Sequence, residues 1–154
     1  MIQVYVNHYN HAEPRQPLGY IESCMFENVI TFGTFDLLHV GHVRLIQRSA
    51  KLGKRLIVGV SSDALTIQKK GQKPTFSQTE RMEIIKMIKG VDAVFLEEKL
   101  ELKEEYLKKH HADLLVMGDD WTGKFDFCKS ICQVKYIART PSISTTAIVE
   151  KLKG

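Results

Sequence analysis

Two histidines stand three residues apart at the end of a glycine-bounded segment, GTFDLLHVGH, over residues 33–42. The residues before the segment favour a β-strand and those after it have helical spacing, so His39 and His42 should share one face at a helix start. Backbone N–H groups and the positive end of the helix dipole favour an anion there. The imidazoles add donors that can follow charge as it develops on a phosphate. A pair of hydrogen-bonded surface histidines is the plainer interpretation, and the strand ending in GTFD disfavours it.

A second cluster, RTPSISTT over residues 139–146, has an arginine followed by several hydroxyl residues. A predicted strand precedes it and a predicted helix follows it. Ser144 or Thr145 can cap that helix, and the Arg139 guanidinium can grip phosphate oxygens in a bidentate manner. The segment is therefore a second candidate anion site, in which capping and phosphate binding are compatible.

A third cluster, MGDDWTGKFDF over residues 117–127, places two aspartates and the single tryptophan after another predicted strand. Asp119 and Asp120 could hold Mg²⁺ or hydrogen-bond a ribose and base, and Trp121 could stack on a ligand. The alternative is a tight loop in which the aspartates cap turns and Trp121 packs into the core. Taken alone, the cluster favours that alternative.

The elements that must position these clusters alternate along the chain. The hydrophobic pattern predicts strands at residues 29–33, 55–61, 91–96, 113–118 and 133–137. It predicts helices at residues 40–52 (closed by Gly53), 77–90 (behind a Ser77–Glu80 capping box), 101–111 (charged and solvated) and 144–153. This alternation indicates an α/β fold, a Rossmann-like doubly wound parallel sheet in a single domain. Ligands of such sheets bind beyond the carboxyl ends of the strands, where all three clusters lie.

Composition limits the classes of function. The 154 residues suit one domain, and 44% apolar with 26% charged residues indicates a globular chain. A net charge of +4 suits small anions and gives weak grounds for a nucleic-acid partner. No apolar run approaches the roughly 20 residues of a membrane-spanning helix, and the N-terminus lacks the pattern of a secretion signal. The three cysteines form no CxxC pair, so we expect reduced cytosolic thiols and neither a disulfide framework nor a zinc site.

The N-terminus stands apart from the alternating pattern. Residues 1–24 precede a second methionine, Met25, from which a complete β-α domain could extend over residues 25–154. Ile2, Val4 and Val6 alternate with polar residues, so this arm of unknown role is either an edge strand or a flexible tail.

GTFDLLHVGH together with RTPSISTT resembles the cytidylyltransferase branch of the HxGH nucleotidyltransferases, and MGDDWTGKFDF narrows the resemblance to the glycerol-3-phosphate cytidylyltransferase family. The resemblance covers about residues 26–151. It implies that the domain transfers CMP from CTP to sn-glycerol 3-phosphate, giving CDP-glycerol and pyrophosphate for teichoic-acid or capsule-type polymers. It also implies Mg²⁺ bound through the CTP phosphates, a homodimer, a cytoplasmic location, and neither nucleic acid nor membrane as a partner.

The resemblance also assigns roles to residues. It implies catalytic roles for His39, His42, Lys69 and Arg139, and no metal held by the protein itself. The implied nucleotide contacts are Thr34, Phe35, His39, His42, Gly118, Asp119, Asp120, Arg139, Thr140, Ile143, Ser144, Thr145 and Thr146. The implied acceptor contacts are Asp36, Lys69, Lys73 and Lys103. The loop KKGQKP carries one residue more than the family pattern, so Lys70 and Lys73 compete for one role.

Other substrates and a non-enzymatic role are the alternatives. Phosphoethanolamine and phosphocholine carry a cationic amine that would want carboxylates or an aromatic cage, whereas the lysines suit an acceptor with only anionic and hydroxyl groups. An ATP-using adenylyltransferase similar to FAD synthetase shares much of the pattern, but MGDDWTGKFDF disfavours it. A nucleotide-sensing module would have lost a histidine or the basic loop, and neither is lost.

Overall fold

The computed structural model describes residues 25–141 and 144–153. Five parallel strands form one sheet in the order β3-β2-β1-β4-β5. The strands are β1 (Phe26–Gly33), β2 (Gly53–Ser61), β3 (Ala93–Glu97), β4 (Leu114–Gly118) and β5 (Gln133–Ile137). The chain adds β2 and β3 on one side of β1, then reverses and adds β4 and β5 on the other side. This confirms the Rossmann-like doubly wound sheet, and it puts the reversal beside the carboxyl end of β1.

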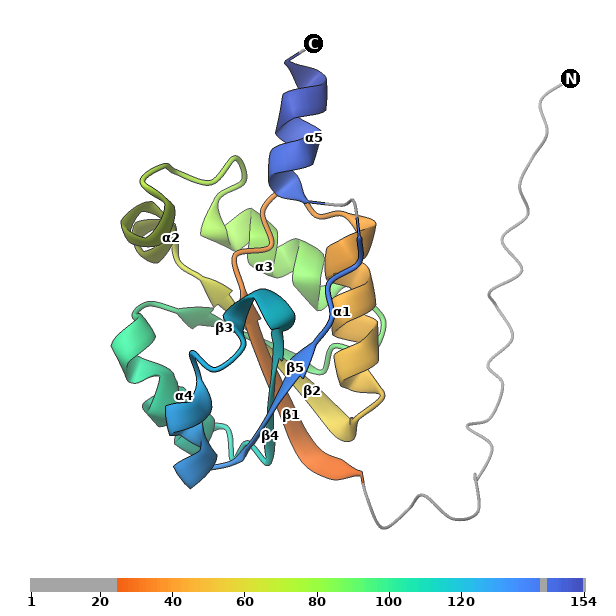
Figure 1. Cartoon of the computed structure of the whole chain (residues 1–154), viewed down its shortest axis with the longest axis vertical. Helices are drawn as coiled ribbons and strands as arrows, with labels where there is room; N and C mark the ends of the chain where they lie inside the picture. Colours follow the sequence, from red (N-terminus) through yellow and green to blue (C-terminus); the bar gives the residue numbers. More distant parts are fainter. Residues whose placement is uncertain (1–24, 142–143, 154) are drawn as a thin grey trace, which may run out of the picture.

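The helices cover both faces of the sheet and its carboxyl edge (Figure 1). They are α1 (Val40–Ala50), α2 (Asp63–Lys70), α3 (Gln78–Lys86), α4 (Lys103–Lys109) and α5 (Thr145–Leu152), with short 3₁₀ turns η2 (Leu100–Leu102), η3 (Asp119–Trp121) and η4 (Asp126–Ser130). On one face, Ile46 of α1 and Ile85 of α3 pack on the sheet. On the other face, Leu107 of α4 and Cys128 of η4 do so. Among the described residues, no helix is both long and apolar enough to cross a bilayer.

Local signals account for the helix starts. His39 and Ser77 each begin a capping box, and the Ser77–Glu80 box is the one predicted. Ser144 caps α5 by accepting a hydrogen bond from the Ala147 N–H at 3.1 Å. Each cap fixes the direction in which a helix leaves the carboxyl edge of the sheet.

Several predicted boundaries were wrong. Helix α1 ends at Ala50 with Lys51 as its cap in the right-handed region, so Gly53 does not close the helix and instead begins β2. Helix α3 ends at Lys86, short of Gly90. The helix expected over residues 101–111 is a 3₁₀ turn followed by α4, and one of its faces is buried through Lys103 and Leu107, so it is not simply solvated.

Helix α2 was not predicted, although its caps are readable in the sequence. The Ser62 side chain accepts a hydrogen bond from the Leu65 N–H at 3.0 Å. Gly71 ends the helix in the left-handed conformation at φ 73°. With two buried side chains in eight residues, α2 has too short an apolar pattern to stand out, yet it carries Lys69 and Lys70 to the carboxyl edge.

Candidate active site

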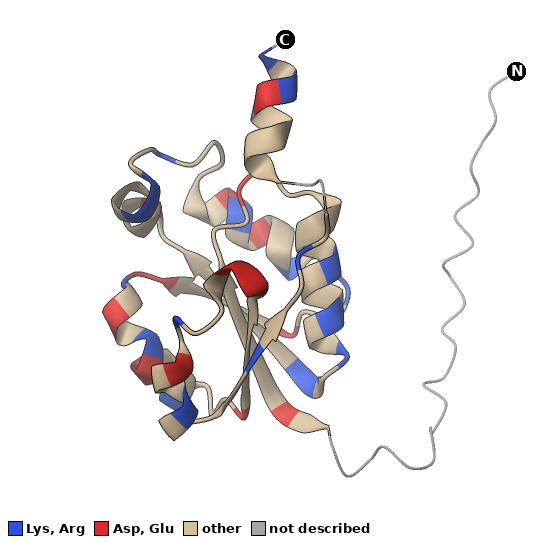
Figure 2. Cartoon of the chain, in the orientation of Figure 1, with Lys and Arg blue, Asp and Glu red and all other residues tan. Residues whose placement is uncertain are grey.

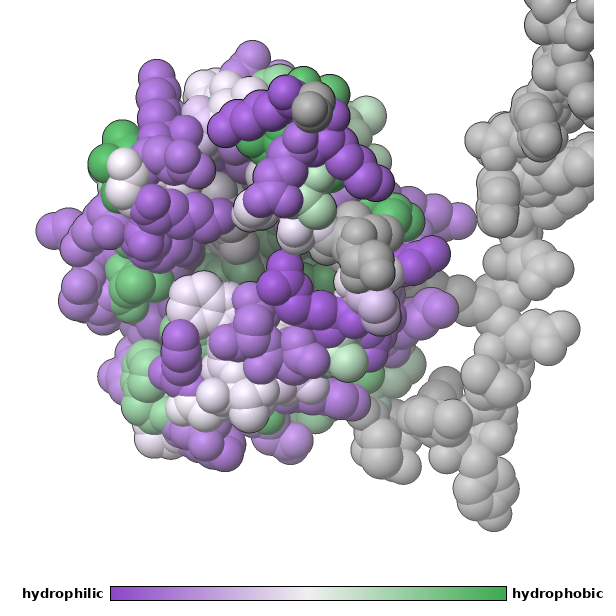
Figure 3. Space-filling model, turned by 45° about the horizontal axis from the view of Figure 1, so that its top comes forward, coloured by the Kyte–Doolittle hydropathy of each residue, from purple (hydrophilic) through white to green (hydrophobic). Residues whose placement is uncertain are grey.

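The carboxyl edge of the sheet opens into a cavity of about 410 Å³. Figure 3 shows the molecule hollowed at this end, with a hydrophilic rim around a more apolar floor. Figure 2 shows basic residues on α2 and acidic residues in η3 at the same end. Most predicted site residues line this one cavity, namely Thr34, Phe35, Asp36, His39, His42, Lys69, Lys103, Gly118, Asp120, Arg139, Thr140, Ser144, Thr145 and Thr146. The three sequence clusters therefore converge on a single site.

Two predicted residues that the structure describes, Lys73 and Asp119, are not brought to the lining. Among the described residues, Lys73 is exposed and off the cavity wall, whereas its competitor Lys70 lines the wall. Asp119 is exposed and also off the cavity wall, and its carboxylate accepts a hydrogen bond from the Arg139 backbone N–H at 3.3 Å. Ile143 and the arm of residues 1–24 lie outside the described residues.

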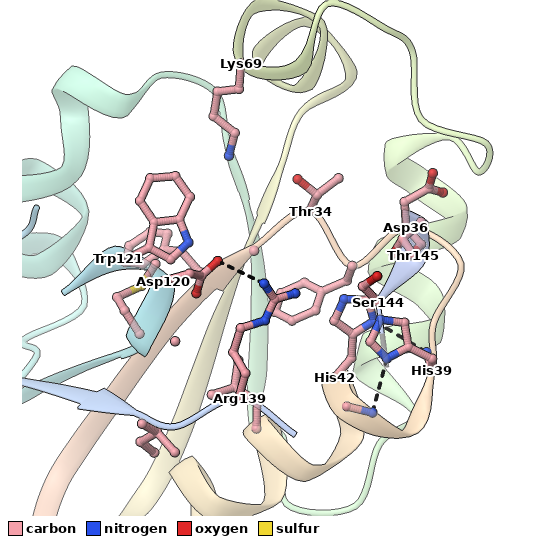
Figure 4. Close-up of a pocket in the computed structure, with 18 of the residues that line it drawn as sticks. Thr34, Asp36, His39, His42, Lys69, Asp120, Trp121, Arg139, Ser144 and Thr145 are labelled. Atoms are coloured by element: carbon pink, nitrogen blue, oxygen red, sulfur yellow. Dashed lines mark hydrogen bonds and ion pairs between the residues drawn. The ribbon is translucent and has the colours of Figure 1, made fainter. Parts of the chain in front are cut away.

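The two histidines form a stacked pair at the start of α1, with ring centroids 3.8 Å apart (Figure 4). His39 Nδ1 accepts a hydrogen bond from the Gly41 N–H at 3.1 Å, and His42 Nδ1 accepts one from the His39 N–H at 3.4 Å. A neutral ring whose Nδ1 accepts carries its proton on Nε2. Each ring can therefore offer one Nε2–H donor to a ligand in the cavity.

The environment keeps both imidazoles uncharged. Burial, followed by His39, Lys70 and Arg139, lowers the pKa of His42 to about 4. Burial, followed by the charge of Arg139, also lowers the pKa of His39. At neutral pH the site thus presents neutral donors among fixed cations, an arrangement that favours an anionic ligand.

The segment between β1 and α1 is backbone-strained. Phe35 and Leu37 have φ of 54° and 45°, in the left-handed region that bulky residues rarely adopt. Asp36 holds the segment from one side, because its carboxylate accepts hydrogen bonds from the N–H groups of Thr75 and Phe76 at 2.8 and 2.9 Å. The Asp36 carboxylate, predicted to contact the acceptor, is thus also engaged in tying two loops together.

The start of α5 is joined directly to this strained segment. The Thr145 hydroxyl donates a hydrogen bond to the Asp36 carbonyl at 3.0 Å, across a separation of 109 residues. Ser144 both caps α5 and lines the cavity, so the two interpretations of this segment hold together. The N-termini of α1 and α5, each with its polar residues, open into the same space.

The third cluster forms the wall opposite the histidines (Figure 4). The Asp120 carboxylate lies 3.7 Å from the Arg139 guanidinium. A Cβ on Gly118 would come within 2.6 Å of an Asp120 oxygen, so a larger residue there would displace the Asp120 carboxylate. Trp121 packs on Phe125 and still lines the cavity, and Lys69 Nζ lies 5.9 Å from its ring centroid. Trp121 is therefore both part of the core and part of the site.

Two lysines reach the floor of the cavity and share a buried carboxylate. Lys103 forms an ion pair with Glu97, and both side chains are 1% exposed. Its ammonium lies 3.4 Å from the Phe32 ring centroid. Burial lowers the pKa of Lys103 to about 8, although Glu97 acts to raise it. Burial likewise lowers the pKa of Lys69.

Comparison with known proteins identifies the family of this chain. Residues 30–151 match the family model described as cytidylyltransferase-like. The chain belongs to this family. It is 46% identical over 128 residues to a glycerol-3-phosphate cytidylyltransferase of Bacillus subtilis (strain 168), covering 83% of this chain and 98% of the relative.

Two further comparisons agree with the cytidylyltransferase-like assignment. A glycerol-3-phosphate cytidylyltransferase of Staphylococcus aureus (strain NCTC 8325 / PS 47) is 42% identical over 128 residues, covering 83% of this chain and 96% of the relative. The crystal structure of a lipopolysaccharide core biosynthesis protein from Thermoplasma volcanium GSS1 superposes with a TM-score of 0.64 at 26% identity, covering 74% of this chain and 98% of that one. The resemblance found in the sequence is confirmed.

Sequence reasoning missed Glu97, which lines the cavity of this cytidylyltransferase-like site, and Arg81, which supports it from behind. Glu97 directly follows the predicted strand at residues 91–96, and nothing local marks it as the partner of Lys103. Arg81 is fully buried and donates to the carbonyls of Thr34 (2.6 Å) and Ser61 (2.8 Å), among other partners. A signal for Arg81 existed, because it lies four residues before Ile85 on the apolar face of α3.

Proposed function

We propose that this protein transfers CMP from CTP to sn-glycerol 3-phosphate, giving CDP-glycerol and pyrophosphate. The observation that carries the proposal is the convergence of the His39–His42 pair and the Ser144–Thr146 segment on one cavity that also holds Lys69 and Lys103. Relatives 42% and 46% identical over most of this chain bear the name of that activity. Helix N-termini and imidazole donors suit a triphosphate, and ammonium groups suit a second phosphate.

The chemistry we infer is an in-line displacement. An oxygen of the acceptor phosphate attacks the α-phosphorus of CTP while the bond to the β-phosphate breaks and pyrophosphate leaves. The acceptor is already ionised at neutral pH, so no general base is required, and catalysis rests on alignment and charge stabilisation. His39, His42 and Lys69 would hydrogen-bond the α-phosphate as negative charge builds there. Arg139 would balance charge on the departing β- and γ-phosphates.

Mg²⁺ would enter with the nucleotide. In residues 25–141 and 144–153, no group of three His, Cys, Asp or Glu side chains could hold a metal ion. This donor set fits an ion carried by the triphosphate, since Mg²⁺ usually keeps several waters and binds substrate phosphates with few protein ligands. When bound, Mg²⁺ supplies charge neutralisation on the triphosphate, and Asp120 is the lining carboxylate beside Arg139 that could face its waters.

The floor of the cavity favours an acceptor without a cationic amine. Phe32, Phe125 and Trp121 present aromatic faces at this floor that could help to cage a quaternary amine, but lysine ammonium groups already lie over them. A cationic acceptor would therefore meet like charges. Glycerol 3-phosphate presents only hydroxyl and anionic groups and fits this floor better than phosphocholine or phosphoethanolamine.

The test is pyrophosphate release from CTP or ATP with Mg²⁺ and a panel of alcohol phosphates. We expect release with CTP and glycerol 3-phosphate to exceed release with phosphoethanolamine, phosphocholine or FMN by at least tenfold. Preferential release with phosphoethanolamine, or with ATP and FMN, would overturn the substrate assignment.

We further propose the setting of the reaction. The product would supply activated glycerol phosphate for teichoic-acid or capsule-type polymers in the cytoplasm. The free thiols of Cys128 and Cys132 are consistent with a reducing compartment. A homodimer is consistent with α5, which projects from the body of the molecule, buries no residue and leaves Leu152 79% exposed (Figure 1). Sedimentation equilibrium tests the dimer.

A further inference from the structure

A continuous chain of polar groups runs beneath the cavity from one lysine to the other. Lys69 Nζ donates to Ser61 Oγ at 3.1 Å, and Ser61 Oγ donates to Glu97 Oε2 at 3.0 Å. The other carboxylate oxygen, Oε1, accepts from Lys103 Nζ. We call Ser61 and Glu97 the Ser61–Glu97 bridge. It connects an ammonium from α2 with an ammonium from α4.

The sheet itself sets the geometry of this bridge. Ser61 and Glu97 are paired residues at the carboxyl ends of β2 and β3. Both are buried, with exposed fractions of 0% and 1%. Adjacent parallel strands hold their paired residues at a fixed spacing, so the positions of Ser61 and Glu97 are set by the sheet and do not depend on a bound ligand.

Both lysines at the ends of the bridge reach the cavity wall, whereas Ser61 does not. Lys69 and Lys103 both line the cavity, as does Glu97. A buried ion pair is weak grounds for stability alone, because desolvation offsets most of the attraction. Two ammonium groups around one carboxylate also leave a net positive charge, which suits an incoming phosphate.

We propose that Glu97 and Ser61 are positioning residues that hold the ammonium groups of Lys69 and Lys103 in place for the acceptor phosphate. This inference rests on the proposed function, since it names what orients the acceptor end of that site. Neither Glu97 nor Ser61 needs to touch the reacting atoms. In the proposed reaction Lys69 meets the CTP α-phosphate only as charge builds there. The effect of these two residues should therefore fall on the acceptor and on kcat, and should spare the initial binding of CTP, whose expected contacts are near α1, η3 and the start of α5.

The charge of Glu97 should also keep the lysines protonated. Besides burial, the groups that influence the pKa of Lys103 are, in decreasing order, Glu97, Lys69 and Cys128. Those that influence Lys69 are Glu97, Lys70 and Arg81. In both cases Glu97 raises the pKa of the ammonium against burial. Loss of the carboxylate should therefore lower both pKa values, so that each lysine loses its charge at a lower pH.

The test compares Glu97→Gln with Glu98→Gln, which removes the same charge from the next residue, an exposed one. We expect Glu97→Gln to raise KM for glycerol 3-phosphate at least tenfold at pH 7.5 and to leave the Kd for CTP, from equilibrium dialysis, within twofold. Between pH 7.5 and 9 the acceptor phosphate is almost entirely dianionic. In this range the pH at which the acceptor KM begins to rise should be lower in Glu97→Gln than in the wild type by about one unit or more. Glu98→Gln should match the wild type in all three.

Ser61→Ala serves as the second variant, because it cuts the link to Lys69 without changing charge. We expect Ser61→Ala to raise the acceptor KM three- to tenfold and to leave CTP binding unchanged. If Glu97→Gln fails to fold, the result for Ser61→Ala alone tests the inference. Equal losses toward both substrates, or an unchanged acceptor KM in both variants, would overturn the inference. A wild-type protein that does not use glycerol 3-phosphate would instead overturn the proposed function.

Discussion

At the scale of single residues, the site depends on imidazoles that are donors without being cations. Their Nδ1 atoms are occupied by backbone N–H groups, which fixes the Nε2–H for a ligand. The spacing of His39 and His42 predicted their shared face. It could not predict their pKa values, which depend on burial and on Lys70 and Arg139, residues distant in sequence.

Replacing His42 tests its role toward the α-phosphate. His42→Asn should lower kcat at saturating CTP and acceptor by about 10²–10³-fold, because one donor to a developing oxyanion contributes roughly 2.7–4 kcal/mol. Pyrophosphate release measures it. The matched control is His111→Asn, since His111 is exposed and asparagine tolerates its positive φ of 49°. A rate for His42→Asn within threefold of the wild type would refute the assignment.

The lowered pKa of His42 also predicts a pH effect on stability. The unfolded histidine titrates near 6.5 and the folded one at about 4, so between these values the unfolded chain binds more protons. The free energy of unfolding should therefore fall as pH decreases from 6.5 toward 4. Urea denaturation of the wild type and His42→Asn at pH 7 and pH 5 measures this, and the variant should lose less stability. Equal losses would contradict the low pKa.

At the scale of elements, Arg81 joins four segments that meet at the carboxyl edge. Its guanidinium contacts the loop after β1, the end of β2 and the start of α2, where it pairs with Asp63 at 2.6 Å. It also donates to the Phe76 carbonyl just before α3. We call this set of contacts the Arg81 clamp. Through the Thr34 carbonyl it holds the chain directly before the strained residues Phe35 and Leu37.

Removing the clamp should destabilise the fold. Arg81→Met should lower the free energy of unfolding by about 2–4 kcal/mol, because buried carbonyls and a carboxylate lose their donor. Lys86→Met, on an exposed position of the same helix, should change it by less than about 0.5 kcal/mol. Chemical denaturation compares the two. Similar values for both variants would show that the clamp does not stabilise the fold.

The elements also show what the sequence could predict. The long apolar runs of β2 and β4 and the Ser77–Glu80 box predicted their elements well, since these signals are local. Helix α2 was missed because eight residues give little periodicity. The Lys103–Glu97 pair was missed because a charge-rich segment normally indicates a solvated helix face. Nothing in the sequence shows that the Glu97 carboxylate is buried at the carboxyl end of β3, where Lys103 meets it.

At the scale of the whole molecule, the first and last described elements close the site together. The hydrogen bond from Thr145 to the Asp36 carbonyl is the direct link between the two helix starts. Each start alone is a weak anion site. Convergence in one cavity gives the positive potential and the alignment that a triphosphate requires.

Cutting this link should weaken nucleotide binding. Thr145→Val should raise the Kd for CTP about fivefold, as expected for loss of one hydrogen bond of about 1 kcal/mol. Isothermal titration calorimetry measures it. Thr79→Val, at an exposed position of α3, is the control and should bind CTP as the wild type does. Unchanged affinity in Thr145→Val would mean that α5 is not part of the nucleotide site.

The most direct test of the whole account follows the phosphorus atoms. ³¹P NMR of the protein with CTP, Mg²⁺ and glycerol 3-phosphate distinguishes attack at the α-phosphorus from attack further out. We predict loss of the triphosphate and glycerol 3-phosphate signals, growth of a diphosphate diester and release of pyrophosphate in equal amount. Release of orthophosphate with formation of CDP would contradict displacement at the innermost phosphorus.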